Sequence, residues 1–137
     1  MMTDSRQGEL PIVSEIDIVQ ARRVIRDVVT ELSFGITDVT RIVTAASELA
    51  RNTIVYAGSG VMRWRVLDER GAVGIELVFE DHGPGIEDVA QAMQKGYSTG
   101  KGLGMGLPGA QRLMDELEID SAVGRGTTIL IRKWQRR

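Results

Sequence analysis

The sequence lacks cysteine altogether and contains a single histidine, His82. Without cysteine, the chain can have no disulfide framework, no thiolate metal site and no cysteine nucleophile. One histidine excludes a metal site built from several histidine ligands, and it argues against a Ser-His-Asp triad. The chemistry of this chain therefore has to come from carboxylates, amides, hydroxyls and the backbone.

Long apolar runs and a strong charge imbalance are also missing. No stretch approaches the roughly 20 apolar residues that a membrane span needs, and the N-terminus lacks the basic start and apolar core of a signal peptide. The formal net charge of -2 gives no basic surface for nucleic acid. We therefore expect a cytoplasmic protein that binds neither nucleic acid nor a membrane.

The chain does contain enough apolar residues for one core. Its 137 residues, of which 42% are hydrophobic, fit one domain spanning residues 1–137. Apolar residues recurring with helical period predict a helix over about 17–32, capped by Asp17, and a second helix that starts at Thr37 or Asp38 and ends at "AGSG". A short helix over 89–93 and a third long one over 110–117 follow.

Alternating apolar residues predict the strands. A short strand in "LPIVSEID" precedes the first helix, "VMRWRVL" and "AVGIELVFE" lie in the middle of the chain, and "EIDSAV" and "TTILIRKW" end it. This order is not the strict alternation of strand and helix that builds a doubly wound parallel sheet. We expect an α/β two-layer sandwich: one mixed, mostly antiparallel sheet with helices on one face.

Glu48 and Asn52 stand four residues apart on the second predicted helix. This spacing places both side chains on one side of the helix, off its apolar stripe. They could be ordinary solvent-facing residues. A carboxylate and an amide oxygen on one rim could also hold Mg²⁺ or its waters and orient a nucleophile.

The segment "EDHGPGI", residues 80–86, follows the most apolar strand. Asp81 lies where the strand stops pairing, and its carboxylate can accept a hydrogen bond from an exocyclic amine. Gly83 and Gly85 leave room for a planar base against the backbone, and Pro84 stiffens the turn. A plain β-turn has the same composition, so this segment alone leaves both interpretations open.

Three alternating glycines, Gly102, Gly104 and Gly106, precede the third long helix. Alternate glycines let backbone N–H groups point at an anion, the helix N-terminus adds partial positive charge, and Lys101 could add a full charge. The segment lacks the preceding strand of a dinucleotide fingerprint and the Gly-Lys-Ser/Thr ending of a Walker A loop. The alternative is a flexible linker, for which "LGMGLP" is too apolar.

The run "GRGT", residues 124–127, lies between the last two strands. A tight hairpin needs no further function to explain it. Thr127, at the start of a strand beside the Asp81 strand, could nevertheless share a contact to a base.

Taken in this order, "ELARN", "DHGPG", "GLGMGL" and "GRGT" resemble the motifs of the GHKL ATPase/kinase superfamily, which includes histidine-kinase catalytic domains, gyrase B, Hsp90 and MutL. The likeness covers about residues 13–134. Within the superfamily the chain looks most like the RsbT-type serine/threonine switch kinases of the stressosome, an anti-sigma factor kinase family. The resemblance implies the Bergerat ATP-binding fold, with ATP and Mg²⁺ as cofactors.

The resemblance also implies a role for each motif residue. Glu48 would be the general base, Asn52 the Mg²⁺ ligand, and Asp81 the reader of the adenine amine. Gly85 would flank the adenine and Thr127 would support the base. The nucleotide-binding residues implied in this way are Asn52, Asp81, Gly83, Gly85, Ile86, Lys101, Gly102, Leu103, Gly104, Met105, Gly106, Leu107 and Thr127.

The implied reaction transfers the γ-phosphate of Mg·ATP to a serine or threonine hydroxyl that Glu48 aligns. The implied acceptor is a STAS-domain protein of the RsbS or RsbR type. A PP2C-type phosphatase regulator of the RsbU type would be a second partner, bound when the kinase is released. Residues 93–102 would form a short lid over the nucleotide, and we expect 95–102 to be poorly ordered without it.

Three alternatives stay open. A two-component histidine kinase fragment needs a phosphoacceptor histidine on a dimerisation helix, whereas His82 lies inside the aspartate motif. A SpoIIAB-like anti-sigma factor kinase would have the same fold and site but would bind a sigma factor directly. A non-catalytic nucleotide-binding regulator would have a degenerate site, and the presence of both Glu48 and Asn52 argues against it.

Overall fold

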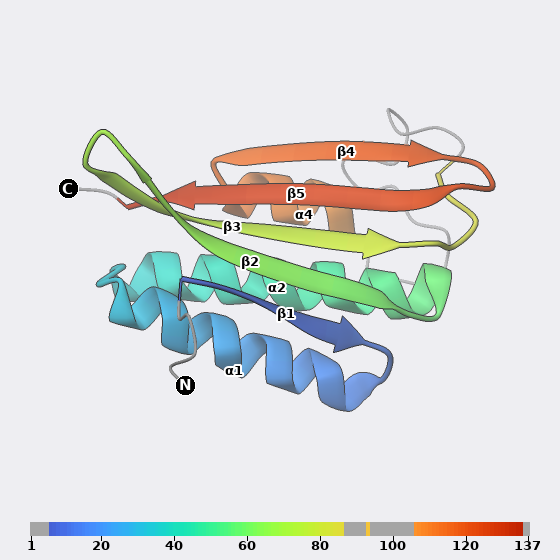
Figure 1. Ribbon diagram of the computed structural model, residues 1–137, viewed down its shortest axis with the longest axis horizontal. Coiled ribbons are helices and arrows are strands. Elements are labelled where there is room, and N and C mark those ends of the chain that lie inside the picture. The colour runs from blue at the N-terminus through green and yellow to red at the C-terminus, as the bar shows by residue number, and fades with distance from the viewer. Residues whose placement is uncertain (1–5, 87–92, 94–105, 136–137) are drawn as a thin grey trace.

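The computed structural model describes residues 6–86, 93 and 106–135, and it has a sheet in front of a layer of helices (Figure 1). The strand order in this part is β1-β2-β3-β5-β4, and all four pairings are antiparallel. The predicted fold class, a two-layer α/β sandwich with helices on one face, is confirmed. In chain order the elements are β1 Gln7–Ile12, α1 Glu15–Glu31, α2 Ile36–Ala57, β2 Gly60–Glu69, β3 Ala72–Asp81, α4 Gly106–Leu113, β4 Glu116–Ala122 and β5 Gly126–Trp134.

The two long helices bury the stripes that their periodicity predicts. Buried positions on α1 are Ile18, Ala21, Ile25 and Val29. The stripe on α2 runs from Val39 to Thr53 and packs with the first helix against the inner face of the sheet, where Met62, Leu77, Phe79 and Ile131 are buried. Each large side chain buried in this way stabilises the fold by about 1.5–3 kcal/mol relative to its exposed state.

The start of α1 differs from the prediction. Ser14 is the N-cap, and Asp17 occupies the third helical position. The Asp17 carboxylate accepts hydrogen bonds from the backbone N–H groups of Val13, at 2.9 Å, and Ser14, at 3.1 Å. Asp17 thus closes a capping box from inside the helix instead of capping it. The second helix begins at Ile36, one residue before the first predicted start.

The third long helix was predicted too late in the chain. The structure has α4 over Gly106–Leu113, and β4 covers Glu116–Ala122. At the end of this helix, Lys133 donates a hydrogen bond to the carbonyl oxygen of Leu113 at 3.0 Å, and so satisfies one of the terminal carbonyl groups. The short helix predicted over 89–93 lies outside the described residues except for Met93, which is in a turn.

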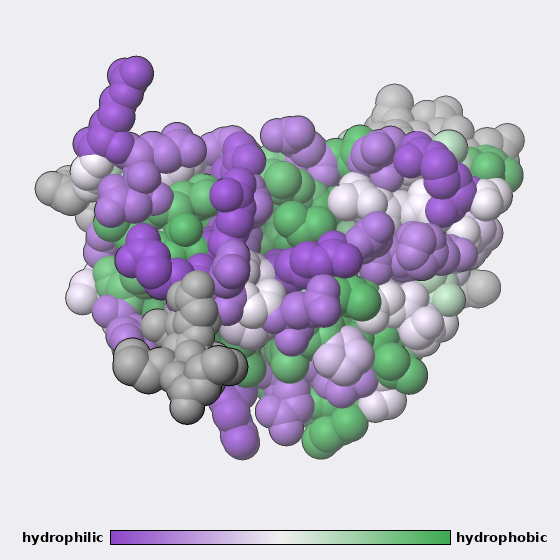
Figure 2. All heavy atoms as spheres, in the orientation of Figure 1, coloured by the Kyte–Doolittle hydropathy of each residue, from purple (hydrophilic) through white to green (hydrophobic). Residues whose placement is uncertain are grey.

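The outer face of the sheet has no helix over it in the described part of the chain, and charged side chains cross it between apolar patches (Figure 2). Arg65 and Arg132 each approach Glu76 at 2.7 Å, and Arg132 also pairs with Glu116 at 3.1 Å. Burial alone would raise the pKa of Glu76. Hydrogen bonds from Arg65 and Arg132 outweigh it, so the pKa lies below its ordinary value.

No helix within residues 6–86 and 106–135 combines the length and apolar character that crossing a membrane demands.

Replacing Glu76 by glutamine should lower the free energy of unfolding at neutral pH by about 1–3 kcal/mol, because two arginines lose a charged partner. The folded pKa is depressed, so the stabilisation exists above the unfolded pKa and is lost as the pH falls through the folded pKa. Urea unfolding at several pH values below neutral should therefore show a steeper loss of stability in the wild type than in Glu76→Gln.

Glu118 lies exposed on the same face of the sheet, and Glu118→Gln is the matched control. It should unfold like the wild type at each pH. Equal pH slopes for the wild type and Glu76→Gln would contradict the role of the Glu76 carboxylate.

Candidate active site

Asp81 is the last residue of β3, and the alternation of that strand sets its direction. Ile75, Leu77 and Phe79 are buried against the helices, so Asp81 lies on the same face of the sheet. The register pairs Asp81 with Gly60 of β2 and with Thr127 of β5. A half-buried carboxylate therefore stands at the end of the sheet, on the helix side.

The Asp81 carboxylate is held by the turn that follows it. Its Oδ1 atom accepts a hydrogen bond from the backbone N–H of Gly83 at 2.9 Å. An ionised carboxylate has about four lone-pair sites, so this bond leaves acceptor capacity for a ligand. A carboxylate fixed in this way can accept a hydrogen bond from an exocyclic amine.

The two glycines of the turn are required by contacts within the protein. A Cβ on Gly83 would stand 2.5 Å from the Cβ of Ala57, at the end of α2. Gly85 has a positive φ of 82°, and a Cβ there would strike the carbonyl of Ala122. The turn is thus clamped between α2 and the β4–β5 turn. The predicted place of both glycines beside an adenine stays a prediction.

Ser121 joins the three segments around Asp81, and the sequence analysis missed it. Its Oγ atom accepts a hydrogen bond from the backbone N–H of Ile86 at 2.8 Å and lies 2.7 Å from the hydroxyl oxygen of Thr127. On β4, Leu117 and Ile119 face the core, and Ser121 is the next residue in this alternation. A hydroxyl at a position expected to face the core was the sequence feature that could have identified it. Ile86 was predicted to bind nucleotide, but its backbone N–H already donates a hydrogen bond within the protein, to Ser121.

Asn52 lies half-buried on α2, and the start of α4 packs against it. A Cβ on Gly106 would stand 2.6 Å from the amide nitrogen of Asn52. The N-terminus of α4 therefore faces Asn52, and a helix N-terminus carries partial positive charge that favours phosphate. The structure brings together the predicted metal ligand Asn52 and the last glycine of the predicted phosphate loop.

The last turns of α2 connect these two groups of residues. Next to Asn52, the methyl group of Thr53 packs against Gly60, which pairs with Asp81. One turn further on, Ala57 contacts Gly83. One helix thus lies against both the aspartate turn and the start of α4, with the half-buried Glu48 one turn before Asn52.

The other predicted residues fall into two groups. Leu107 is buried in the core, so it anchors α4, and only its backbone could reach a ligand. The lid over 93–102, apart from Met93, lies outside the described residues, as does most of the glycine loop: Lys101, Gly102, Leu103, Gly104 and Met105.

The residues present fit a magnesium ion bound together with a phosphate. Within the described ranges, no three histidine, cysteine, aspartate or glutamate side chains converge as a metal site. Mg²⁺ commonly takes one or two protein oxygens and completes its coordination with phosphates and water. The Asn52 amide oxygen, beside the N-terminus of α4, could provide such a ligand.

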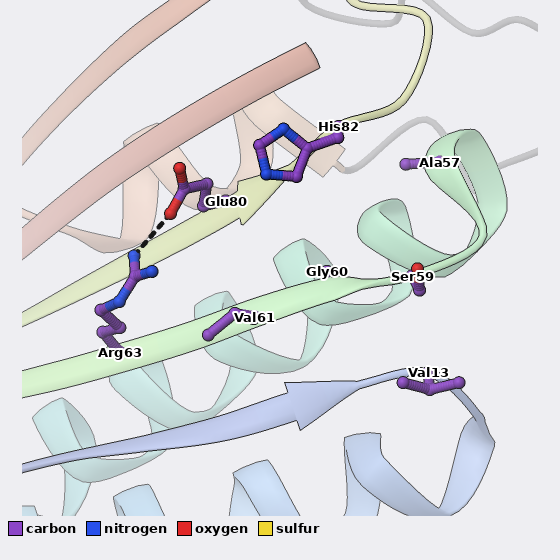
Figure 3. A pocket seen from close by; sticks show the side chains of 8 residues that line it. All are labelled: Val13, Ala57, Ser59, Gly60, Val61, Arg63, Glu80 and His82. Atoms are coloured by element: carbon purple, nitrogen blue, oxygen red, sulfur yellow. Dashed lines mark hydrogen bonds and ion pairs between the residues drawn. The ribbon is translucent and has the colours of Figure 1, made fainter.

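A hollow of about 320 Å³ lies on the outer face of the sheet (Figure 3). Val61 and Glu80 line it, and they alternate with the core residues Met62 and Phe79, so these two side chains lie on the face opposite to Asp81. Ala57, at the end of α2, lines the hollow at the edge of the sheet. Arg63 bridges Glu80 at 2.7 Å and Glu9 at 2.9 Å. The residues around it are Val13, Ala57, Ser59, Gly60, Val61, Arg63, Glu80 and His82.

Known proteins are similar in sequence to this chain over most of its length. Residues 14–133 match the histidine kinase-like ATPase domain family. The serine/threonine-protein kinase RsbT of Bacillus subtilis (strain 168) is 50% identical over 130 residues, which are 95% of this chain and 98% of RsbT. An anti-sigma F factor of Caldanaerobacter subterraneus subsp. tengcongensis is 36% identical over 122 residues, covering 83% of this chain and 82% of that protein.

Two solved structures share the fold. The RsbU and RsbW domains of Rv1364c from Mycobacterium tuberculosis superpose with a TM-score of 0.60 at 21% identity, covering 93% of this chain and 32% of that one. The mycobacterial sensor histidine kinase MprB superposes with a TM-score of 0.56 at 18% identity, covering 95% of this chain and 98% of that one.

The enzyme class expected from the motifs is confirmed by the likeness to RsbT, which extends over both chains almost completely. The protein is a kinase of the serine/threonine type. With the match over residues 14–133 and the sandwich fold that carries it, the chain belongs to the histidine kinase-like ATPase domain family.

Proposed function

We propose that this kinase transfers the γ-phosphate of ATP to a serine or threonine hydroxyl of a partner protein in a cytoplasmic signalling switch. The observation that carries the proposal is the packing of α2 against two sites at once. Its residues contact the aspartate turn, where a base amine can bind, and the start of α4, where phosphates can bind. A single nucleotide could bridge these two sites along the helix.

Each residue of the site has a different role in phosphoryl transfer. Asp81 accepts a hydrogen bond from the adenine amine, and the N-terminus of α4 stabilises the phosphates. Asn52 would hold Mg²⁺, which supplies neutralisation of the charge on the phosphate oxygens. Glu48 precedes Asn52 by one helical turn, about 6 Å along the axis, so its carboxylate can accept the proton of the incoming hydroxyl.

For the partners, we propose a STAS-domain protein as the substrate and a PP2C-type phosphatase as the client of the released kinase. The extent of the likeness to RsbT supports the first assignment. The solved chain in which an RsbU domain and an RsbW domain occur together supports the second.

A second candidate is an anti-sigma factor that binds a sigma subunit directly. The likeness to anti-sigma F factors at 36% identity or less favours it. The two candidates have the same fold and site, and they differ in the partner protein that the kinase binds.

Radiolabelled phosphotransfer with STAS-domain and sigma-factor partners side by side tests the proposal. Label from [γ-³²P]ATP should appear on a serine or threonine of the STAS partner. A stable complex with the sigma factor in the presence of ATP would favour the second candidate. Label on His82, or no label on any partner, would contradict the proposed transfer.

Asp81→Asn should weaken ATP binding by about ten- to a hundredfold, because a hydrogen bond to a charged group contributes roughly 1.5–3 kcal/mol. The asparagine oxygen can still accept the hydrogen bond from Gly83, so the turn should stay folded. Isothermal titration calorimetry measures the change. Glu80→Gln, the neighbouring carboxylate on the outer face, is the control, and equal ATP affinity for Asp81→Asn and the wild type would rule out the role of Asp81.

Glu48→Gln should bind ATP within about twofold of the wild type and transfer phosphate about 10²–10⁴-fold more slowly, because the amide cannot accept the proton. Single-turnover phosphotransfer at saturating ATP separates the two effects. Glu31→Gln, at the exposed end of α1, controls for removal of a helix carboxylate. A wild-type transfer rate in Glu48→Gln would remove Glu48 as the base.

A further inference from the structure

The hydroxyl group of Ser121 has three polar neighbours but only one proton. The backbone N–H of Ile86 donates to it at 2.8 Å, so this contact takes one lone pair of the oxygen. The carbonyl oxygen of Gly126 lies at 3.1 Å and the hydroxyl oxygen of Thr127 at 2.7 Å. The Ser121 proton can serve only one of these last two contacts.

In one assignment of the two hydroxyl protons, all three contacts of Ser121 are hydrogen bonds. Ser121 then donates to the carbonyl of Gly126, and Thr127 donates its own proton to Ser121. In the other assignment Ser121 donates to Thr127, and the oxygens of Ser121 and Gly126 face each other at 3.1 Å without a proton between them. Because Gly126 is buried, water has little access to compensate for the lost bond. The first assignment is therefore the favourable one.

This assignment decides what Thr127 can offer to a ligand. Its proton is donated to Ser121, so towards a ligand the two lone pairs of its hydroxyl oxygen can only accept. The strand register places Thr127 directly opposite Asp81, and side chains paired in this way stand about 4.5–5.5 Å apart at their Cβ atoms. Two acceptors, one carboxylate and one hydroxyl, thus lie side by side at the end of the sheet.

We propose that Ser121 is a positioning residue that determines base specificity. By taking the proton of Thr127, it turns the Thr127 hydroxyl into an acceptor beside Asp81. The pair then selects a purine with a 6-amino group, which carries one N–H donor for each acceptor, over a 6-oxo purine, whose N1 proton is a single donor beside an oxygen that the two acceptors repel. The proposal rests on the proposed nucleotide site and adds the residue that sets its preference.

The matched ligands for the test are ATP and ITP, which differ at position 6 of the base and in the proton on N1. Titration calorimetry with magnesium gives the ratio of their affinities. The wild type should prefer ATP. In Ser121→Ala the Thr127 hydroxyl is free to turn and donate to the 6-oxo group, so the preference should fall by about two- to tenfold, the value of one hydrogen bond.

Thr127→Val removes the same hydroxyl and should lower the preference by a similar factor. The double variant should match Thr127→Val, because Ser121 acts on the preference only through the Thr127 hydroxyl. Ser121→Thr keeps the hydroxyl and should restore the preference. Thr128→Val, on the outer face of the same strand, is the control and should leave it unchanged.

The outcomes separate this proposal from the proposed function. Failure of the wild type to bind ATP would overturn both. ATP binding with an unchanged ATP/ITP ratio in Ser121→Ala, or with additive losses in the double variant, would overturn only the role of Ser121. A wild type that binds ATP and ITP equally would do the same, and this result does not depend on the folding of any variant.

Discussion

Close backbone packing around the end of β3 is the constraint on which the site depends. The strands on either side approach so closely that their facing positions must be glycine: a Cβ on Gly60 would stand 2.5 Å from the carbonyl oxygen of Glu80, and one on Gly126 would strike the carbonyl of Asp81. A larger side chain at either position would push a strand away. Because β2 and β5 begin where β3 ends, Asp81 is held in register with Thr127, and its side chain lies on the face of the sheet that the helices cover.

The second determinant of the site is α2, which contributes one side to the hydrophobic core and another side to the proposed site. Its buried stripe packs on the sheet, while the side with Glu48 and Asn52 is only half-buried. The same packing that stabilises the fold therefore sets the separation between the aspartate turn and the start of α4. The parts of the proposed nucleotide site on α2 and β3 are therefore held in place by the packing of the hydrophobic core.

Local periodicity was enough to predict the buried stripes of α1 and α2 and the strands β2, β3 and β5, since each stripe repeats along its own segment. The α4–β4 boundary was predicted wrongly, because glycine has a low helix propensity and the helix nevertheless starts at Gly106, and because the contact that caps its end comes from Lys133, 20 residues away. Ser121 was missed because its role depends on two contacts that a local sequence pattern does not show. One is its pairing with Thr127 on the next strand, and the other is its hydrogen bond to Ile86, 35 residues earlier in the chain.

We propose that nucleotide binds on the helix side of the sheet, between α2 and the end of β3, and leaves the outer hollow empty. The most direct measurement is a titration of ¹⁵N-labelled protein with Mg²⁺ and a non-hydrolysable ATP analogue, followed by amide chemical shifts. Binding at this site should give large shifts at Asn52, Asp81, Gly106 and Thr127 and small ones at Arg63. Shifts centred on the outer-face residues Val61, Arg63 and Glu80 would contradict this placement.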